Sequence, residues 1–411
     1  MAKVPNVSAA QLVLFELEDR SQSHLIALYD LVPRFVFVTR DNARNEAVTP
    51  ATKDQFVKSI NRDFTFDGRT YYLTMQPARV YRTKAGKFVA SATPEQARDL
   101  VEVEVFPSER EQIVEQVVRR LAMDRSRLSL VGEKRDKVQM RFSLYEIRRE
   151  LRAVNHTWDY TEIREALTIL ARSRIIISKT SDGDGGRKRS SNLLDSTAFP
   201  QMAVRSRPDI AGDDEGEEET YLEFNALVSA AIRDLEFKPV SYEWLMRLKS
   251  PVSRWLYNRL SAQFSMPVGA IQEDDGVKAV TFSADDIIKN SGMNEWSRRR
   301  DTLRAVTAAV DQLVEEGILE NVEKAYDKTG KRIDGIDYVM MPSVRFLEQV
   351  RKARNVQEVN ATVLKTITGS ESRPDGFVPL TPAEALEARS RRSKKLAHAE
   401  AQPKLSLNDA P

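Results

Sequence analysis

The chain has 411 residues, of which 41% are hydrophobic and 30% are charged, proportions typical of a soluble globular protein with two or three domains. It contains no cysteine, which excludes disulfides and thiolate metal sites, and no apolar run long enough to cross a bilayer, so a cytoplasmic location is expected. The 63 basic and 61 acidic residues nearly balance, but three basic clusters stand out, around Arg187, Arg299 and Arg391.

The first 30 residues are predicted to form a flexible arm. They contain the apolar stretch "QLVLF", residues 11–15, which acidic residues follow closely. Exposed apolar residues on an unstructured arm are costly unless a partner buries them. Two interpretations stay open at this point: a peptide that binds another protein, or an edge strand whose Val13 and Phe15 pack under the first domain.

Residues 31–240 are predicted to form a first domain, which begins with strands in "YYLTMQPARVYR" and an amphipathic helix in "EQIVEQVVRRLA". A helix, a polar turn and a second helix follow. Apolar residues recur at helical spacing in both, as Leu144, Ile147 and Leu151 in the first and Ile163, Ala166, Leu167 and Leu170 in the second. Asp159 is the expected cap of the second helix.

Isoleucines at 175–177 change this helical pattern to that of a strand. The strand leads to a glycine-rich basic tip, "SDGDGGRKRSS", and to a return strand through Leu193 and Leu194. An acidic loop follows at residues 213–219. The apolar residues between 221 and 264, which include Trp244 and Trp255, predict a long core helix that joins this domain to the next.

The same order of elements recurs in residues 280–341, within a second domain at residues 241–354. Phe282 and Ser283 lie 140 positions after Phe142 and Ser143, and the apolar stripe of the second helix repeats at a spacing of 143. The strands of this copy flank the tip "DKTGKR", which has the glycine and the charges typical of a β-hairpin.

Helix, turn, helix and basic hairpin are the elements of a winged helix, whose second helix fits the major groove of DNA and whose hairpin, the wing, lies along the backbone or minor groove. After residue 355 the sequence loses periodicity, so residues 355–411 are predicted to be a disordered basic tail. The sequence therefore predicts an α+β fold with tandem winged-helix domains between a flexible N-terminal arm and a disordered C-terminal tail.

Candidate DNA-binding residues lie on the second helix and the wing of each copy. In the second copy they are Arg298, Arg299, Arg300, Thr302, Arg304, Thr307, Lys328, Lys331 and Arg332. In the first copy they are Thr161, Arg164, Thr168, Arg187, Lys188 and Arg189. Arginine contacts guanine or phosphate in bidentate fashion, and a helix N-terminus adds partial positive charge. Because Glu162 and Glu165 are expected on the same exposed face, the first copy is predicted to bind more weakly or to share its surface with a protein partner.

An enzyme is not expected, because the residues that catalysis requires are absent or scattered. His24, His156 and His398 are far apart, so no histidine pair with metal-binding spacing exists. The phosphate-binding loop G-x-x-x-x-G-K-[ST] is also missing. The sequence predicts neither a metal nor a cofactor.

The order of these parts resembles that of winged-helix plasmid replication initiators, most closely the TrfA-like initiators of broad-host-range plasmids. The matching stretches are "QLVLFEL", "RFVFVTRDNARNEA", "EQIVEQVVRRLA" through "IIISK", "FKPVSYEWLMRLKSPVSRWLYNRLSAQF" and "SRRRDTLRAVTAAVDQLVEEGILE", which together span roughly residues 11–345. The resemblance implies a protein that binds direct repeats (iterons) in double-stranded origin DNA, helps open an adjacent A/T-rich stretch and recruits the host helicase and initiator. Residues 181–219 and the basic tail depart from the family pattern.

The resemblance also favours the binding interpretation of the arm. In this family and in other clients of the bacterial sliding clamp, a Q-L-x-L-F peptide inserts into a cleft on the clamp, which here implicates Gln11, Leu12, Leu14 and Phe15. An alternative function, a transcriptional repressor or partition regulator with the same paired winged helices, would have no use for this peptide. The sequence leaves open whether the active form is a monomer or a homodimer, and no membrane partner is expected.

Overall fold

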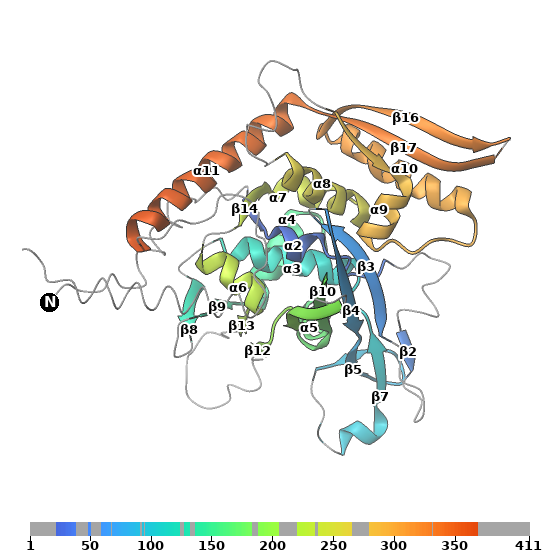
Figure 1. Ribbon diagram of the computed structural model, residues 1–411. Coiled ribbons are helices and arrows are strands. Elements are labelled where there is room, and N and C mark those ends of the chain that lie inside the picture. Colours follow the sequence, from blue (N-terminus) through green and yellow to red (C-terminus); the bar gives the residue numbers. More distant parts are fainter. Residues whose placement is uncertain are drawn as a thin grey trace, which may run out of the picture.

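The computed structural model (Figure 1) describes residues 22–37, 48–50, 59–66, 68–90, 93, 95–123, 127–131, 136–182, 188–204, 220–234, 237–264, 279–330 and 332–368. Over these residues the chain has the predicted α+β fold, with two winged helices in tandem. The predicted clamp-binding peptide at residues 11–15, Arg187, Lys331 and the chain beyond residue 368 lie outside the described residues.

The first winged helix contains α3 (Glu109–Leu121), α4 (Leu144–Ala153), α5 (Tyr160–Arg172) and the predicted hairpin of β10 (Arg174–Asp182) and β11 (Lys188–Ser196). Ser143 begins α4 and Asp159 begins α5, as predicted for the latter. Each side chain accepts a hydrogen bond from the backbone N–H of a glutamate three residues later, and that glutamate accepts one in return from the N–H of the capping residue. Local sequence therefore fixes where both helices start.

Three sheets surround these helices. The wing sheet has the order β11-β10-β4-β3, with β4 at Arg69–Gln76 and β3 at Ile60–Phe66. A second sheet contains β12 (Gln201–Ala203), β13 (Thr220–Glu223), β9 (Lys137–Phe142) and β8 (Leu128–Val131). The third, the accessory sheet, contains β2 (Val48–Pro50), β7 (Val101–Val105), β5 (Ala78–Arg82) and β6 (Phe88–Val89), and a short 3₁₀ helix, η1 (Gln96–Asp99), precedes β7. Because Pro77 alone separates β4 from β5, the chain passes directly from the wing sheet to the accessory sheet.

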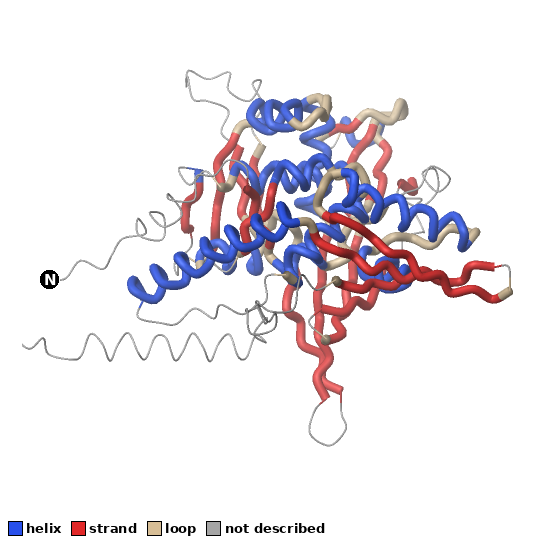
Figure 2. Tube along the Cα trace, turned by 90° about the horizontal axis from the view of Figure 1, so that it is seen from above, coloured by secondary structure: helices blue, strands red, loops and turns tan. Residues whose placement is uncertain are grey.

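The second winged helix contains α8 (Pro251–Gln263), β15 (Val280–Ser283), α9 (Ala284–Ser291), α10 (Arg299–Glu315), β16 (Leu319–Thr329) and β17 (Arg332–Pro342). Its strands form a sheet in the order β15-β17-β16. The β16–β17 hairpin projects from the body of the molecule in both views (Figures 1 and 2). The repeat inferred from the sequence is thus confirmed as a repeat of helix, helix and hairpin.

The prediction of one long helix over residues 221–264 is wrong. The segment forms β13, α6 (Ala226–Arg233), β14 (Lys238–Ser241), α7 (Tyr242–Arg247) and α8. Capping side chains start each helix anew, with Asn225, Ser241 and Ser250 each accepting hydrogen bonds from backbone N–H groups of the next turn. Pro239 and Pro251, which lack an N–H donor, mark two of the interruptions. The apolar composition had correctly indicated burial but not helix length.

Two predicted boundaries are also wrong. Residues 22–30, assigned to a flexible arm, form β1 (Gln22–Leu25), which pairs antiparallel with β14, and most of α2 (Ala27–Leu31), and Leu28 and Tyr29 are fully buried. Residues 355–368, assigned to a disordered tail, continue α11 (Val344–Thr368). For residues 355–368 the described long-range contact is a hydrogen bond of 3.0 Å from Nε2 of Gln357 to the carbonyl of Phe237, whereas β1 and α2 pack their apolar side chains into the core. The core that they join is one continuous cluster, to which both winged helices contribute.

Candidate nucleic-acid interface

The N-terminal half of α10 presents arginines away from the core. Leu303, Val306 and Val310 are buried on one side of the helix, and Arg300 and Arg304 are exposed on the opposite side. Arg298, the residue before the first turn, is also exposed. Among the described residues, no carboxylate forms an ion pair with Arg298, Arg300 or Arg304. These guanidinium groups, together with the positive end of the helix dipole, form a surface that favours a polyanion.

Arg299 points elsewhere. Its guanidinium forms an ion pair with Asp285 of α9 and donates a hydrogen bond of 3.3 Å to the carbonyl oxygen of Asp334 in β17. The side chain is half-buried and joins the three parts of the second winged helix. Of the adjacent arginines predicted to bind DNA, this one holds the helix in place.

Thr302, predicted from the sequence to contact DNA, does not lie on the exposed side of α10. It is fully buried, and its Oγ1 accepts a hydrogen bond of 2.9 Å from the backbone N–H of Trp296, because residues 293–298 fold back over the first turn of α10. Thr307 is half-buried. Its hydroxyl donates to the carbonyl of Leu303 at 2.8 Å and forms a hydrogen bond with the hydroxyl of Tyr338, also at 2.8 Å. Both threonines therefore satisfy their hydroxyl groups within the protein.

The wing of the second copy carries exposed cations beside α10. Lys328 lies over the exposed ring of Tyr326, with its Nζ 5.6 Å from the ring centre. Arg332 is exposed and forms an ion pair of 2.8 Å with Asp334. Lys324 forms an ion pair of 2.7 Å with Asp311 and so connects the wing to α10. Wing and helix are thereby held as one surface.

The second helix of the first copy, α5, does not have an open outer face. The accessory sheet covers it, so the predicted exposure of Glu165 and Thr168 is wrong. Glu165 receives hydrogen bonds from Arg82 of β5 at 2.6 Å and from Arg110 of α3 at 2.9 Å. Ile169, on the same side, is fully buried in a small separate core that the accessory sheet provides, with Ala78, Val80, Val103 and Val105. Most of this face therefore belongs to the protein interior.

The start of α5 and its last residue, Arg172, remain accessible. Thr161 is exposed, whereas Arg164 is half-buried and donates a hydrogen bond of 3.4 Å to the carbonyl of Val204. Lys188 and Arg189 lie in the first residues of β11, next to the tip of the first wing. The structure therefore brings the predicted residues of α10 and the second wing together, while those of the first copy are divided between a covered helix and a wing.

A second cationic stripe, which sequence reasoning missed, lies on α4. Tyr145, Arg148, Arg149 and Arg152 follow the spacing i, i+3, i+4, i+7 and so share one side of the helix, opposite the buried Ile147 and Leu151. Tyr145 is 61% exposed, and the guanidinium of Arg148 lies 4.6 Å from the ring centre of Tyr160. Arg149 forms an ion pair of 3.8 Å with Glu150. The helical spacing of the arginines was the available signal.

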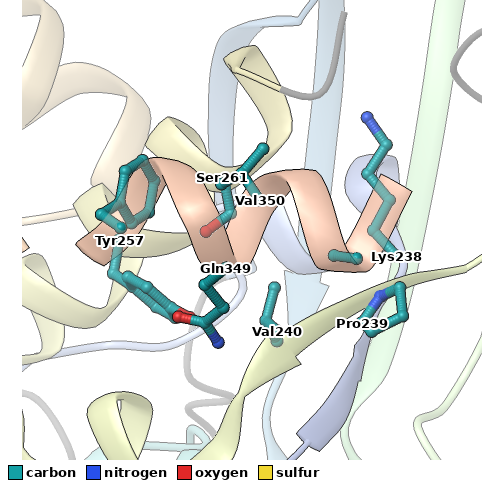
Figure 3. A pocket seen from close by; sticks show the side chains of 9 residues that line it. Lys238, Pro239, Val240, Tyr257, Ser261, Gln349 and Val350 are labelled. Atoms are coloured by element: carbon teal, nitrogen blue, oxygen red, sulfur yellow. The ribbon is translucent and has the colours of Figure 1, made fainter. Parts of the chain in front are cut away.

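Other kinds of site are not evident in the part of the chain that the structure describes. No group of three potential metal ligands occurs there, and no helix is long and apolar enough to cross a membrane. A hollow between β14, α8 and α11 is lined by side chains that include Tyr257, Ser261 and Gln349 (Figure 3), but it has room for only about one water molecule. It is therefore too small for an organic ligand.

Comparisons with known proteins add structural likenesses only. No protein-family model matches the chain, and no curated protein sequence matches it. Two crystal structures of domains 2 and 3 of RctB are similar, at 8% and 7% identity with TM-scores of 0.40 and 0.34, and they cover 73% and 74% of this chain and 96% and 97% of theirs. The Pi initiator protein in complex with iteron DNA is 14% identical with a TM-score of 0.33, over 58% of this chain and 91% of that one. At these scores, the likenesses assign no function to the chain.

Proposed function

We propose that this protein is a replication initiator that binds direct repeats in double-stranded origin DNA, with α10 in a major groove. The observation that carries the proposal is the open, cationic N-terminal half of α10, where Arg298, Arg300 and Arg304 have no described acidic partner and lie beside the wing. A helix of this kind supplies both phosphate contacts and bidentate contacts to guanine.

The first winged helix has a different part in this proposal. Since the accessory sheet covers the outer face of α5, the first copy contacts the DNA backbone through the arginines of α4, the exposed start of α5 and the first wing. Such contacts fix the position of a protein on the duplex without selecting bases. Base selection then depends on α10, which extends the expectation from the sequence that the first copy binds more weakly.

Footprinting on the DNA that flanks the gene for this protein tests the proposal, with protected direct repeats as the expected result. In binding assays on a protected repeat, the variant Arg298→Ala/Arg300→Ala/Arg304→Ala should lower the slope of log K against log salt by up to about 2.7. Base preference should also relax at one or more positions. A matched control removes Lys84, Lys87 and Arg98, exposed cations of the accessory sheet region. Equal losses of DNA affinity and salt slope in the two variants, or no loss in either, would contradict the proposal.

The sequence of the arm extends the proposal to the sliding clamp. Gln11, Leu12, Leu14 and Phe15 are proposed to bind the cleft of the clamp, with Leu14 and Phe15 as apolar anchors. The variant Leu14→Ala/Phe15→Ala should lose capture by the clamp, because truncating two such anchors costs at least ~2–4 kcal/mol, and it should keep its DNA affinity. Loss of both activities would indicate that the peptide belongs to the fold.

Opening of A/T-rich DNA separates this function from that of a repressor or partition regulator. An initiator makes thymines beside its repeats reactive to permanganate, whereas a regulator with the same two winged helices leaves them paired. Recruitment of the host helicase and initiator belongs to the same proposal. Occupied repeats without any permanganate-reactive thymines would favour the regulator.

A further inference from the structure

The second winged helix is attached to the first at two separate places. The first attachment is made by α8, which packs against α2 and α3, and by α11, which packs beside α8 on β14. Trp255 donates a hydrogen bond of 3.2 Å from its Nε1 to the carbonyl of Leu31, and the buried Arg254 donates to Gln112 and Glu109 of α3 at 3.2 and 3.0 Å. Leu256 and Leu260 of α8 lie in the continuous core. This attachment combines apolar packing with buried polar contacts.

The second attachment includes a β-bridge between Phe37 and Met293 and several polar contacts. Arg62 of β3 donates from Nη1 to the carbonyls of Pro33 at 2.9 Å and Phe35 at 3.3 Å, and from Nη2 to Oδ1 of Asn294 at 3.2 Å. It thereby joins the wing sheet, the segment after α2 and the turn after α9. All three acceptors are uncharged, and burial lowers the pKa of Arg62 to about 10. A mostly buried cation among uncharged acceptors is costly, so its position depends on all three hydrogen bonds.

Two further contacts bind α9 to β3, which is an edge strand of the wing sheet. Oδ1 of Asn290 accepts a hydrogen bond of 2.8 Å from the backbone N–H of Thr65, a group at the open edge of that strand. Lys289 and Asp63 form an exposed ion pair of 2.6 Å. We call the contacts of Arg62, Asn290, Asn294 and the Lys289–Asp63 pair the intermodule joint.

Gly292 shows how closely the joint is packed. This residue ends α9 with a φ of +77°, a conformation that favours glycine. A Cβ at this position would overlap the guanidinium of Arg62 and would lie 2.7 Å from the Cβ of Pro33. The second winged helix therefore touches the first with no room for a single methyl group.

We propose that the intermodule joint is a positioning device for DNA binding: it prevents the second winged helix from rotating about its attachment through α8, and so fixes the spacing between the two DNA segments that the protein contacts. The inference rests on the proposed function. The joint acts on α10 through α9, because Arg299 of α10 is paired with Asp285 of α9. Loss of the joint should leave each DNA-binding surface intact but allow the second winged helix to change its orientation relative to the first.

The glycines of the chain supply a matched pair of variants. Gly292→Ala should force the joint apart. Gly317→Ala, in the turn after α10, introduces a side chain at a similar φ of +69° but with no atom within 4 Å of the new Cβ. Both variants place a side chain on left-handed backbone of similar φ in the same module, so a difference between them reports the joint. Arg62→Ala removes the central contact without adding bulk.

Orientation can be measured without DNA. The chain has no cysteine, so spin labels can be attached to cysteines introduced at Ala153 of α4 and Glu315 of α10, both exposed. Double electron–electron resonance should give one narrow distance distribution for the wild type and for Gly317→Ala. Arg62→Ala and Gly292→Ala should each give a broader or displaced one. Identical distance distributions for all four proteins would overturn the proposal.

The effect on DNA is measured with the same variants, unlabelled, on the protected repeat and on a shortened duplex that ends between the segment contacted by α10 and the segment contacted by the first winged helix. The shortening should weaken wild type and Gly317→Ala by ~10-fold or more, because the backbone contacts of the first winged helix are lost. Joint variants should lose clearly less on shortening, because their first winged helix is not held over its DNA segment. If wild type binds the repeat but the change of DNA weakens all four proteins equally, this inference fails and the proposed function stands. If wild type protects no repeats, the proposed function fails, and this inference with it.

Discussion

Neutralising Glu115 is expected to destabilise the protein severely, because its carboxylate lies between two buried arginines. Arg34 donates to both carboxylate oxygens, one of them at 3.0 Å, and Arg119 donates to Oε1 at 2.9 Å. Asp30 provides the remaining negative charge, with bonds of 2.7 and 2.6 Å from Arg119. Glu115→Gln keeps the volume but leaves two buried cations with one anion. Breaking a buried pair in this way costs about 3–5 kcal/mol.

The assay is urea unfolding followed by tryptophan fluorescence at several pH values. Burial alone would raise the pKa of Glu115, but attraction to Arg34 and Arg119 outweighs it, and the pKa lies below the ordinary value of 4.5. A lowered pKa in the folded state gives stability that is present above the ordinary value and is lost as the pH falls through the folded value. The loss of unfolding free energy caused by Glu115→Gln should therefore be largest at pH 7 and shrink in strong acid. A deficit under ~1 kcal/mol at pH 7, or one independent of pH, would refute the reasoning.

Replacing Arg148, Arg149 and Arg152 of α4 by alanine should weaken DNA binding uniformly across sequences and lower the salt slope by up to about 2.7, whereas an unchanged slope would remove α4 from the interface. Thr302→Val should cost about 1–2 kcal/mol in urea unfolding, because the N–H of Trp296 loses its acceptor, and should leave the salt slope unchanged; a lower slope with normal stability would restore Thr302 as a DNA contact. Ile169→Ala should cost about 2–5 kcal/mol by opening the small core under the accessory sheet, and a neutral effect would show that this sheet does not hold α5.

Local signals in the sequence predicted the two winged helices well. The pairs Ser143–Glu146 and Asp159–Glu162 are capping boxes, whose contacts span only three residues, so the starts of α4 and α5 depend on nothing distant. The two hairpins likewise form between neighbouring segments. Apolar periodicity correctly gave the buried sides of α5 and α10, since a helix buries one stripe wherever it lies.

The surface facing away from that stripe could not be predicted in the same way. Whether Glu165 is exposed depends on the accessory sheet, and that sheet combines residues 48–50, 78–89 and 101–105 with a helix some 60 residues later. Thr302 is buried because the chain before α10 folds back onto it, an effect of turn conformation. Periodicity identifies the side that a helix turns toward its own core; it does not show what covers the other side.

The pairing of β1 with β14 also constrains how the chain folds. Asp30 meets Arg119 of α3 only 89 residues later, but Gln22 pairs with Ser241 and Trp255 donates to the carbonyl of Leu31, so residues 22–31 are fully packed only after more than 200 further residues have been made. At typical rates of synthesis this interval lasts about 10–45 s. During that time Leu25, Ile26 and Leu28, all buried in the finished protein, lack the part of their cover that β14 and α8 provide. The first winged helix thus completes its folding only when α8, the first helix of the second winged helix, has emerged from the ribosome. A nascent chain that stalls before that point exposes an apolar segment to which chaperones bind.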